Sequence, residues 1–140
     1  MLTDIYNETI TIFNKLRRSD SALGKDVWYK TVLHNAAWYT DSARSAGGQN
    51  VYIGSYITIL IPFGNRYKPY LEWKEPGCQN DYFTASLGDY IVKGVVDEII
   101  TADNIVKTLE KYGENVCLVR HHNELHDRFG AKVQLKIQGV

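Results

Sequence analysis

Short stretches of alternating or β-branched hydrophobic residues recur along the chain and predict a protein built mainly of β-strands. The cleanest alternation covers residues 131–137, where Val133, Leu135 and Ile137 face one side and Lys132, Gln134 and Lys136 the other. Strand-like composition also marks residues 8–14, 26–41, 51–53, 56–61, 90–92 and 115–120. Asn35 is expected to bend or bulge the second of these strands. Pro62 should end the fourth, because proline cannot donate a ladder hydrogen bond.

Only one stretch has a convincing helical period. Ile105, Leu109 and Tyr112 recur at i, i+4 and i+7, and Gly113 is suited to the left-handed position after a helix. The sequence therefore predicts a helix over about 102–112 whose apolar face lies on a sheet.

Short strands with a single helix predict a mainly β (α+β) fold, namely a small antiparallel β-barrel or sandwich with one flanking helix and long loops. A chain of 140 residues can bury a core of its own, and it contains no internal repeat. We expect one domain over residues 1–140. Residues 95–100 are interpreted as a further strand, and residues 121–130 as a polar loop.

The charge balance and the termini narrow the class of protein. Lys and Arg total 16, as do Asp and Glu, so the net charge is zero, which disfavours general coating of nucleic acid. Residues 1–5 lack the features of a signal peptide, and the apolar run 57–63 is too short to span a bilayer. We therefore expect neither secretion nor a membrane segment, and we expect Cys78 and Cys117 to be reduced.

The segment 64–80 is long, irregular and aromatic. Tyr67, Tyr70 and Trp73 occur within seven residues, beside Arg66 and two prolines. Buried Trp, Tyr and Arg dominate the energetics of many protein interfaces, so these four residues are the candidate interface site. In the competing interpretation, the rings fold back and cap the barrel.

A histidine-rich cluster near the C-terminus is the one group of residues that warrants a test for metal chemistry. It consists of His121, His122, Glu124, His126 and Asp127. His122 and His126 have metalloprotease spacing, but that motif requires Glu directly after the first His on a helix, and Asn123 stands there. We expect polar side chains around a turn, with no metal and no cofactor.

The chain offers little for catalysis. Asp97 and Glu98 are adjacent on a predicted strand, so their carboxylates would point to opposite faces and make a poor acid–base pair. The sequence contains no phosphate-binding glycine motif and no Gly-x-Ser-x-Gly. We do not expect an enzyme.

Several motifs follow one another in an order that resembles a family of small prophage proteins from Gram-positive hosts. They are TITIFNK at 9–15, WYKTVLHNAAW at 28–38, ITILIP at 57–62, GDYIVKG at 88–94 and HNE…FG at 122–130. The resemblance covers most of the chain. The final hairpin is longer here than in the family pattern and lacks a Ser after Gly130.

The resemblance implies a virion structural protein from the head–tail joining region, or neck, of a tailed phage. Such a head-closure or connector subunit would assemble into a ring with copies of itself and touch portal, adaptor or tail proteins. Packaged DNA would lie nearby in the ring lumen without sequence-specific contacts, and the protein would reside in the virion after synthesis in the host cytoplasm. No enzymatic activity or cofactor is implied.

Two alternatives remain open from the residues themselves. One is a small module that binds a carbohydrate or peptide, using Tyr67, Tyr70 and Trp73 as a stacking platform. The other is a metal-dependent hydrolase at His122 and His126.

Overall fold

The computed structural model describes residues 6–45, 52–64 and 66–140, with the backbone alone for 41–45 and 52–55. Its strands are β1 (Glu8–Leu16), β2 (Val27–Ser45), β3 (Tyr52–Pro62), β4 (Tyr90–Lys93), β5 (Val116–His126) and β6 (Lys132–Gly139). Its helical elements are α1 (Tyr70–Trp73), α2 (Ile105–Glu110) and the 3₁₀ turn η2 (Gly113–Asn115). The mainly β prediction is confirmed.

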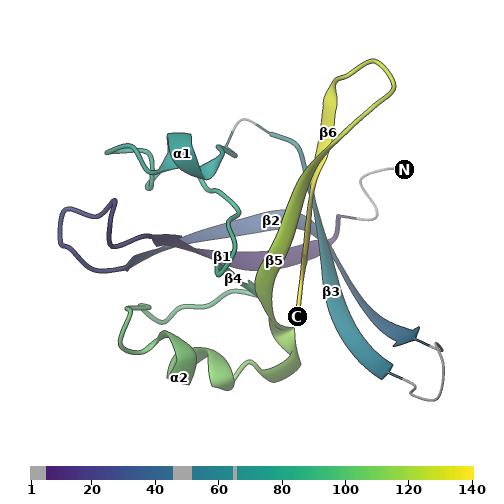
Figure 1. The fold of residues 1–140 in the computed structure, drawn as a ribbon, viewed down its shortest axis with the longest axis horizontal. Coiled ribbons are helices and arrows are strands. Elements are labelled where there is room, and N and C mark those ends of the chain that lie inside the picture. Colours follow the sequence, from purple (N-terminus) through teal and green to yellow (C-terminus); the bar gives the residue numbers. More distant parts are fainter. Residues whose placement is uncertain (1–5, 46–51, 65) are drawn as a thin grey trace.

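The six strands close into an antiparallel barrel in the order β1-β2-β3-β6-β5-β4, with β4 pairing back onto β1 (Figure 1). Two long connections leave the barrel and return to it. We call residues 66–89, which contain α1, the capping segment, and residues 94–115, which contain α2, the α2 segment. Figure 1 shows α1 above the barrel and α2 below it.

A bulge in β2 allows this strand to serve two neighbours. Glu8 pairs with Ala36 but Ile10 pairs with Leu33, so the register shifts where β2 contains His34 and Asn35. The bend expected at Asn35 is therefore confirmed. Before the bulge β2 pairs with β1, and beyond it residues Ala37 to Ser45 pair with β3.

Strand alternation sends side chains into two separate hydrophobic cores. The interior core contains Ile10, Ile12, Ala36, Ile57, Ile59, Ile61, Phe83, Ala85, Ile91, Cys117, Val119, Leu135 and Ile137. The outer core, on the opposite face of β1 and β4, contains Phe13, Val92, Val96, Ile100, Ile105 and Leu109. The α2 segment covers this outer face, so the expected flanking helix with its Ile105–Leu109 face is confirmed.

The helix is shorter than the predicted 102–112. The Asn104 side-chain oxygen accepts a hydrogen bond from the Thr101 N–H at 2.7 Å, which holds a turn where the first helical residues were expected. Gly113 has φ 54° and opens the 3₁₀ turn that leads into β5.

Two other predictions about local structure were wrong. Residues 95–100 form a loop, because Gly94 ends β4 with φ 102° and Val96 and Ile100 then turn onto the outer core. His121 to His126 lie on β5, which continues well past the predicted end at residue 120 because it pairs with β6.

At Gly139, β6 leaves no room for a side chain beside β5. A Cβ built there would stand 2.6 Å from the Cys117 sulfur and closer still to the Leu118 carbonyl oxygen. Leu118 and Val140 exchange two backbone hydrogen bonds, of 3.0 and 3.2 Å, directly beside this point.

None of the helices in the described ranges is long and apolar enough to cross a membrane.

Candidate functional site

The capping segment closes one end of the barrel. Phe83 and Ala85 belong to the interior core, and Tyr67 forms a short parallel bridge with Phe83. The Lys68 N–H donates to the Phe83 carbonyl at 2.9 Å, and the Phe83 N–H donates to the Arg66 carbonyl at 2.9 Å. These bonds hold Arg66 and Tyr67 beside Phe83, whose side chain lies in the interior core.

Trp73 is fully buried within its own chain. Its indole N–H donates to the Tyr82 carbonyl at 3.0 Å, and its ring meets Tyr29 edge-on at 5.8 Å between centroids. The structure therefore places Trp73 as the self-packing interpretation expects, with no surface to offer a partner.

Tyr70 is half-buried and ties α1 to the loop between β1 and β2. Its hydroxyl donates to Asp20 at 2.7 Å and accepts from the Arg17 N–H at 3.1 Å. The Arg17 guanidinium lies 4.2 Å from the centre of the Tyr70 ring. Burial raises the pKa of Tyr70, and the hydrogen bond to Asp20 adds to the rise.

Tyr67 packs between two phenylalanines. Its ring lies 5.7 Å from Phe63 and 5.8 Å from Phe83, edge-on in both cases. Burial, with smaller contributions from Glu124 and Glu72, raises the pKa of Tyr67 to about 12. Among the four candidate residues, Arg66 alone has an exposed side chain.

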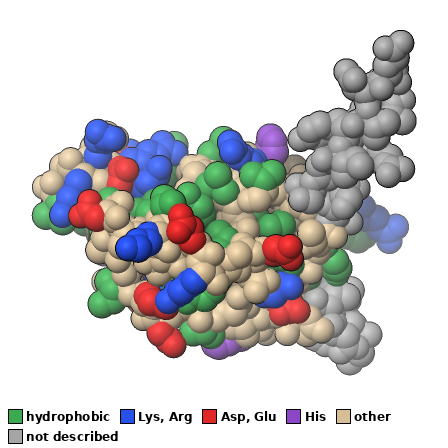
Figure 2. Space-filling view, turned by 90° about the horizontal axis from the view of Figure 1, so that it is seen from below, with side chains coloured by type: hydrophobic (Ala, Val, Ile, Leu, Met, Phe, Trp, Pro, Cys, Tyr) green, Lys and Arg blue, Asp and Glu red, His purple; other side chains and the backbone are tan. Residues whose placement is uncertain are grey.

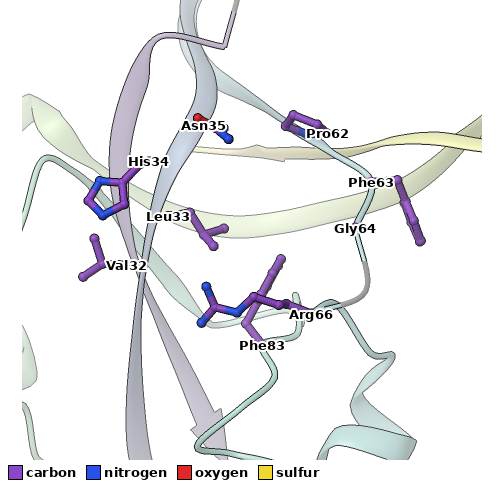
Figure 3. A pocket seen from close by; sticks show the side chains of 9 residues that line it. All are labelled: Val32, Leu33, His34, Asn35, Pro62, Phe63, Gly64, Arg66 and Phe83. Atoms are coloured by element: carbon purple, nitrogen blue, oxygen red, sulfur yellow. The ribbon is translucent and has the colours of Figure 1, made fainter. Parts of the chain in front are cut away.

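A pocket of about 410 Å³ opens beside Arg66, at the end of the barrel near the capping segment. Its lining residues are Val32, Leu33, His34, Asn35, Pro62, Phe63, Gly64, Arg66 and Phe83. Figure 3 shows the Arg66 side chain reaching toward Val32 and Leu33, with Phe83 beside it. The bulge in β2 contributes His34 and Asn35, so the same irregularity that redirects β2 also shapes this hollow.

A buried polar cluster locks the far end of the capping segment to β1. Asp89 accepts hydrogen bonds from the Asn14 amide at 2.9 Å, the Ser86 N–H at 3.0 Å and the Lys15 N–H at 3.1 Å. The Asn14 amide also donates to the Thr84 carbonyl at 2.6 Å. Burial raises the pKa of Asp89 to about 7, although the three donors oppose the rise.

Sequence reasoning missed this cluster. Gly88 and Asp89 appeared only within the motif at 88–94, and Asn14 only as the last residue of a predicted strand. The one usable signal was a polar Asn at the end of an apolar alternation, which local pattern cannot link to a carboxylate 75 residues away.

The histidine-rich cluster lies on the β5–β6 hairpin instead of in a loop. His121 pairs with Gln138 and His122 with Ile137, and both histidines are exposed. Asp127 holds the turn, since its side chain accepts from the Phe129 N–H at 2.8 Å and the Ala131 N–H at 3.0 Å. Across the part of the chain that the structure describes, no group of three or more His, Cys, Asp or Glu side chains is arranged to hold a metal.

The two cysteines are free, and Cys117 lies in the interior core, where burial raises the pKa of its thiol to about 12.

Charged side chains of both signs are interspersed over the face seen from below, with hydrophobic side chains among them (Figure 2). Among the described side chains, the large apolar ones with the highest exposure are Leu23, Leu71, Leu87, Ile99, Val106 and Phe129.

The fold thus defines a small, closed, six-stranded antiparallel barrel with one end capped and one flank covered by a helix. Residues 5–140 match the model of DUF6751, a family of unknown function, and the chain belongs to this family. No curated protein and no solved structure matches the chain.

Proposed function

We propose that this chain is a structural subunit of a tailed phage or phage-like particle, located at the neck between head and tail. Copies of the chain form a ring of the head-closure or connector type, which contacts neighbouring portal, adaptor or tail proteins. DNA passes near the lumen without sequence-specific contacts, and the role is structural, not catalytic. The ordered motif resemblance to prophage proteins supports this proposal.

The observation that carries the proposal is a pair of hairpin arms, the end of β2–β3 and the tip of β5–β6, that run past the body of the barrel (Figure 1). Pairing of β2 with β3 continues to Ser45 and Tyr52, although pairing of β1 with β2 ends at Ala36 and pairing of β3 with β6 ends at Ile57. The β5–β6 arm begins where β5 leaves β4, whose pairing with β5 covers only Val116 to Leu118, but β6 remains paired with β3 over Gln134 to Gly139. Only its tip, from His126 to Lys132, therefore has no third strand beside it.

Such arms are costly for an isolated barrel, since a two-stranded hairpin alone is marginally stable in water. They are useful to a subunit that must reach its neighbours in an assembly. At the tip of the β5–β6 arm Phe129 is 82% exposed, and the Arg128 guanidinium lies 5.0 Å from the centre of its ring. An exposed aromatic ring beside an arginine, on a turn shaped by Asp127, is a composition typical of protein contacts.

The alternative of a carbohydrate- or peptide-binding module has less support. It requires Tyr67, Tyr70 and Trp73 to form an open stacking platform. Trp73 is buried and one face of Tyr70 is occupied by Arg17, so these three rings do not present a common free surface.

Disruption of the gene in a host that produces the particle tests the proposal. We expect purified wild-type particles to contain the chain in a fixed copy number by quantitative mass spectrometry. We expect the disrupted strain to accumulate separate heads and tails by electron microscopy, with joining restored by a plasmid copy. Particles that lack the chain and are still joined would refute a neck role.

A further inference from the structure

The pocket beside Arg66 has the chemistry of a receptor for an apolar side chain that stands next to a carboxylate. Its walls include the half-buried Leu33 and Phe63 and the buried Phe83. Arg66 supplies a cation at the rim, and its side chain makes no ion pair with another residue in the described ranges. A guanidinium binds a carboxylate most strongly when part of its surroundings excludes water.

The α2 segment exposes the complementary chemistry. Ile99 is 82% exposed and Val106 63% exposed, so this segment presents two large aliphatic side chains to solvent. Asp97 is exposed two residues before Ile99 and, within the described part of the chain, its carboxylate has no cationic partner. Hydrogen bonds from Asn104 to Ile99 and from Thr101 to Asn104 hold this loop in shape, which lowers the cost of ordering it on binding.

The two surfaces lie on different sides of the molecule. The pocket is formed by β2, the end of β3 and the start of the capping segment, near α1, whereas Asp97 and Ile99 belong to the loop before α2 (Figure 1). A contact between them therefore requires two copies and joins unlike faces. Contacts of this heterologous kind generate rings when the rotation closes and filaments when it does not.

We propose that the pocket beside Arg66 receives the Asp97–Ile99 loop of a second copy of this chain, with Ile99 seated against Leu33 and Phe83 and Asp97 paired with Arg66. This inference rests on the proposed function, whose ring needs a repeated contact between unlike faces, and it names that contact. The 410 Å³ pocket is large enough for one aliphatic side chain and leaves Arg66 at its edge. The ion pair would set the orientation and specificity of the contact, and burial of Ile99 would supply most of its affinity.

Charge reversal tests this pairing on the purified full chain. Arg66→Glu and Asp97→Arg each place like charges opposite one another, so we expect each to weaken self-association at least about tenfold by sedimentation velocity. Arg66→Glu mixed with Asp97→Arg in equal amounts, and the double variant carrying both changes, should regain association because opposite charges meet again. Ile99→Asp should also weaken association, and thermal melting should show that all these exposed changes leave the fold intact.

Arg18→Glu and Glu110→Arg serve as matched controls, because both side chains are exposed and neither lies at the proposed contact. Equal weakening by these controls, association unaffected by the single reversals, no recovery in the double variant, or a wild-type chain that stays monomeric would each overturn the inference. The neck proposal is judged separately by particle composition and joining. A ring that resists the charge reversals would refute this contact and leave the neck role standing.

Discussion

The capping segment and the α2 segment both leave the barrel, form a short helix and return to a strand, yet they are held in different ways. The capping segment inserts Phe83 and Ala85 into the barrel interior and buries Trp73 at a site where its indole N–H has a partner. Its end is locked by the hydrogen bonds that converge on Asp89. The α2 segment instead lies on the outer face of β1 and β4 through aliphatic side chains, chiefly Ile105 and Leu109.

This difference indicates which of the two segments the stability of the barrel depends on. A segment that seals the interior with buried hydrogen bonds cannot move without exposing the main core and leaving polar groups unpaired. A segment that covers an outer face can loosen while the barrel stays closed. We therefore expect the α2 segment to detach from the barrel more easily than the capping segment, although α2 is the longer helix and the one that the sequence pattern predicts. The α2 segment also contains the exposed Ile99 and Val106.

The largest effect is expected at Trp73. Trp73→Ala should reduce the free energy of unfolding by about 3–5 kcal/mol, because it removes a fully buried ring and leaves the Tyr82 carbonyl without its donor. Equilibrium denaturation in urea measures the change. Trp73→Phe is the matched control and should cost clearly less, since most of the packing remains. A change below about 1 kcal/mol for the alanine variant would show that the capping segment does not stabilise the barrel.

A smaller loss is expected from Leu109→Ala in the α2 segment. Truncation of a buried Leu costs about 2–5 kcal/mol, and we expect the lower part of that range because a six-residue helix on an outer face can settle into the space. Val106→Ala, on the exposed side of the same helix, should change stability by less than about 0.5 kcal/mol. Amide hydrogen exchange adds a test of the comparison: residues 105–110 should exchange faster than β1 and β4 in the wild-type protein.

The smallest effect is a pH dependence that originates at Asp89. Burial raises its pKa to about 7, against about 4 in an unfolded chain, so the folded protein binds the proton more tightly. The contribution of this proton to the free energy of unfolding is complete below about pH 4 and is lost as the pH rises toward 7. The free energy of unfolding should therefore fall by on the order of 2 kcal/mol between pH 5 and pH 7.

Denaturation of the wild type and of Asp89→Asn across this pH range checks the prediction. The variant should be less stable at every pH, because an amide nitrogen would face backbone donors. Its free energy of unfolding should not show the decrease between pH 5 and pH 7 that titration of Asp89 causes in the wild type. Parallel pH profiles for the two proteins would assign the slope to other groups.

Local pattern was enough for much of the fold. The alternation at 131–137 predicted β6 to within a few residues, the polar break at Asn35 predicted the bulge, and the period of Ile105 and Leu109 predicted the buried face of α2. These features follow from periods of two and 3.6 residues, which the sequence carries directly. The predicted ends of strands were less accurate where pairing with a neighbouring strand sets them. For example, β5 continues to His126 because it pairs with β6 over this length.

What the sequence by itself determined, therefore, is the mainly β class, the position of most strands, the bulge in β2 and the buried face of the amphipathic helix. Tertiary structure alone decided the closure of β4 onto β1, the link between Asn14 and Asp89, and the burial of Trp73. The composition of residues 66–73 is equally suited to an interface and to a cap, because aromatic rings bury apolar area in either place. Which surface these rings cover depends on contacts between residues far apart in the chain, and the local hydrophobic pattern contains no information about those contacts.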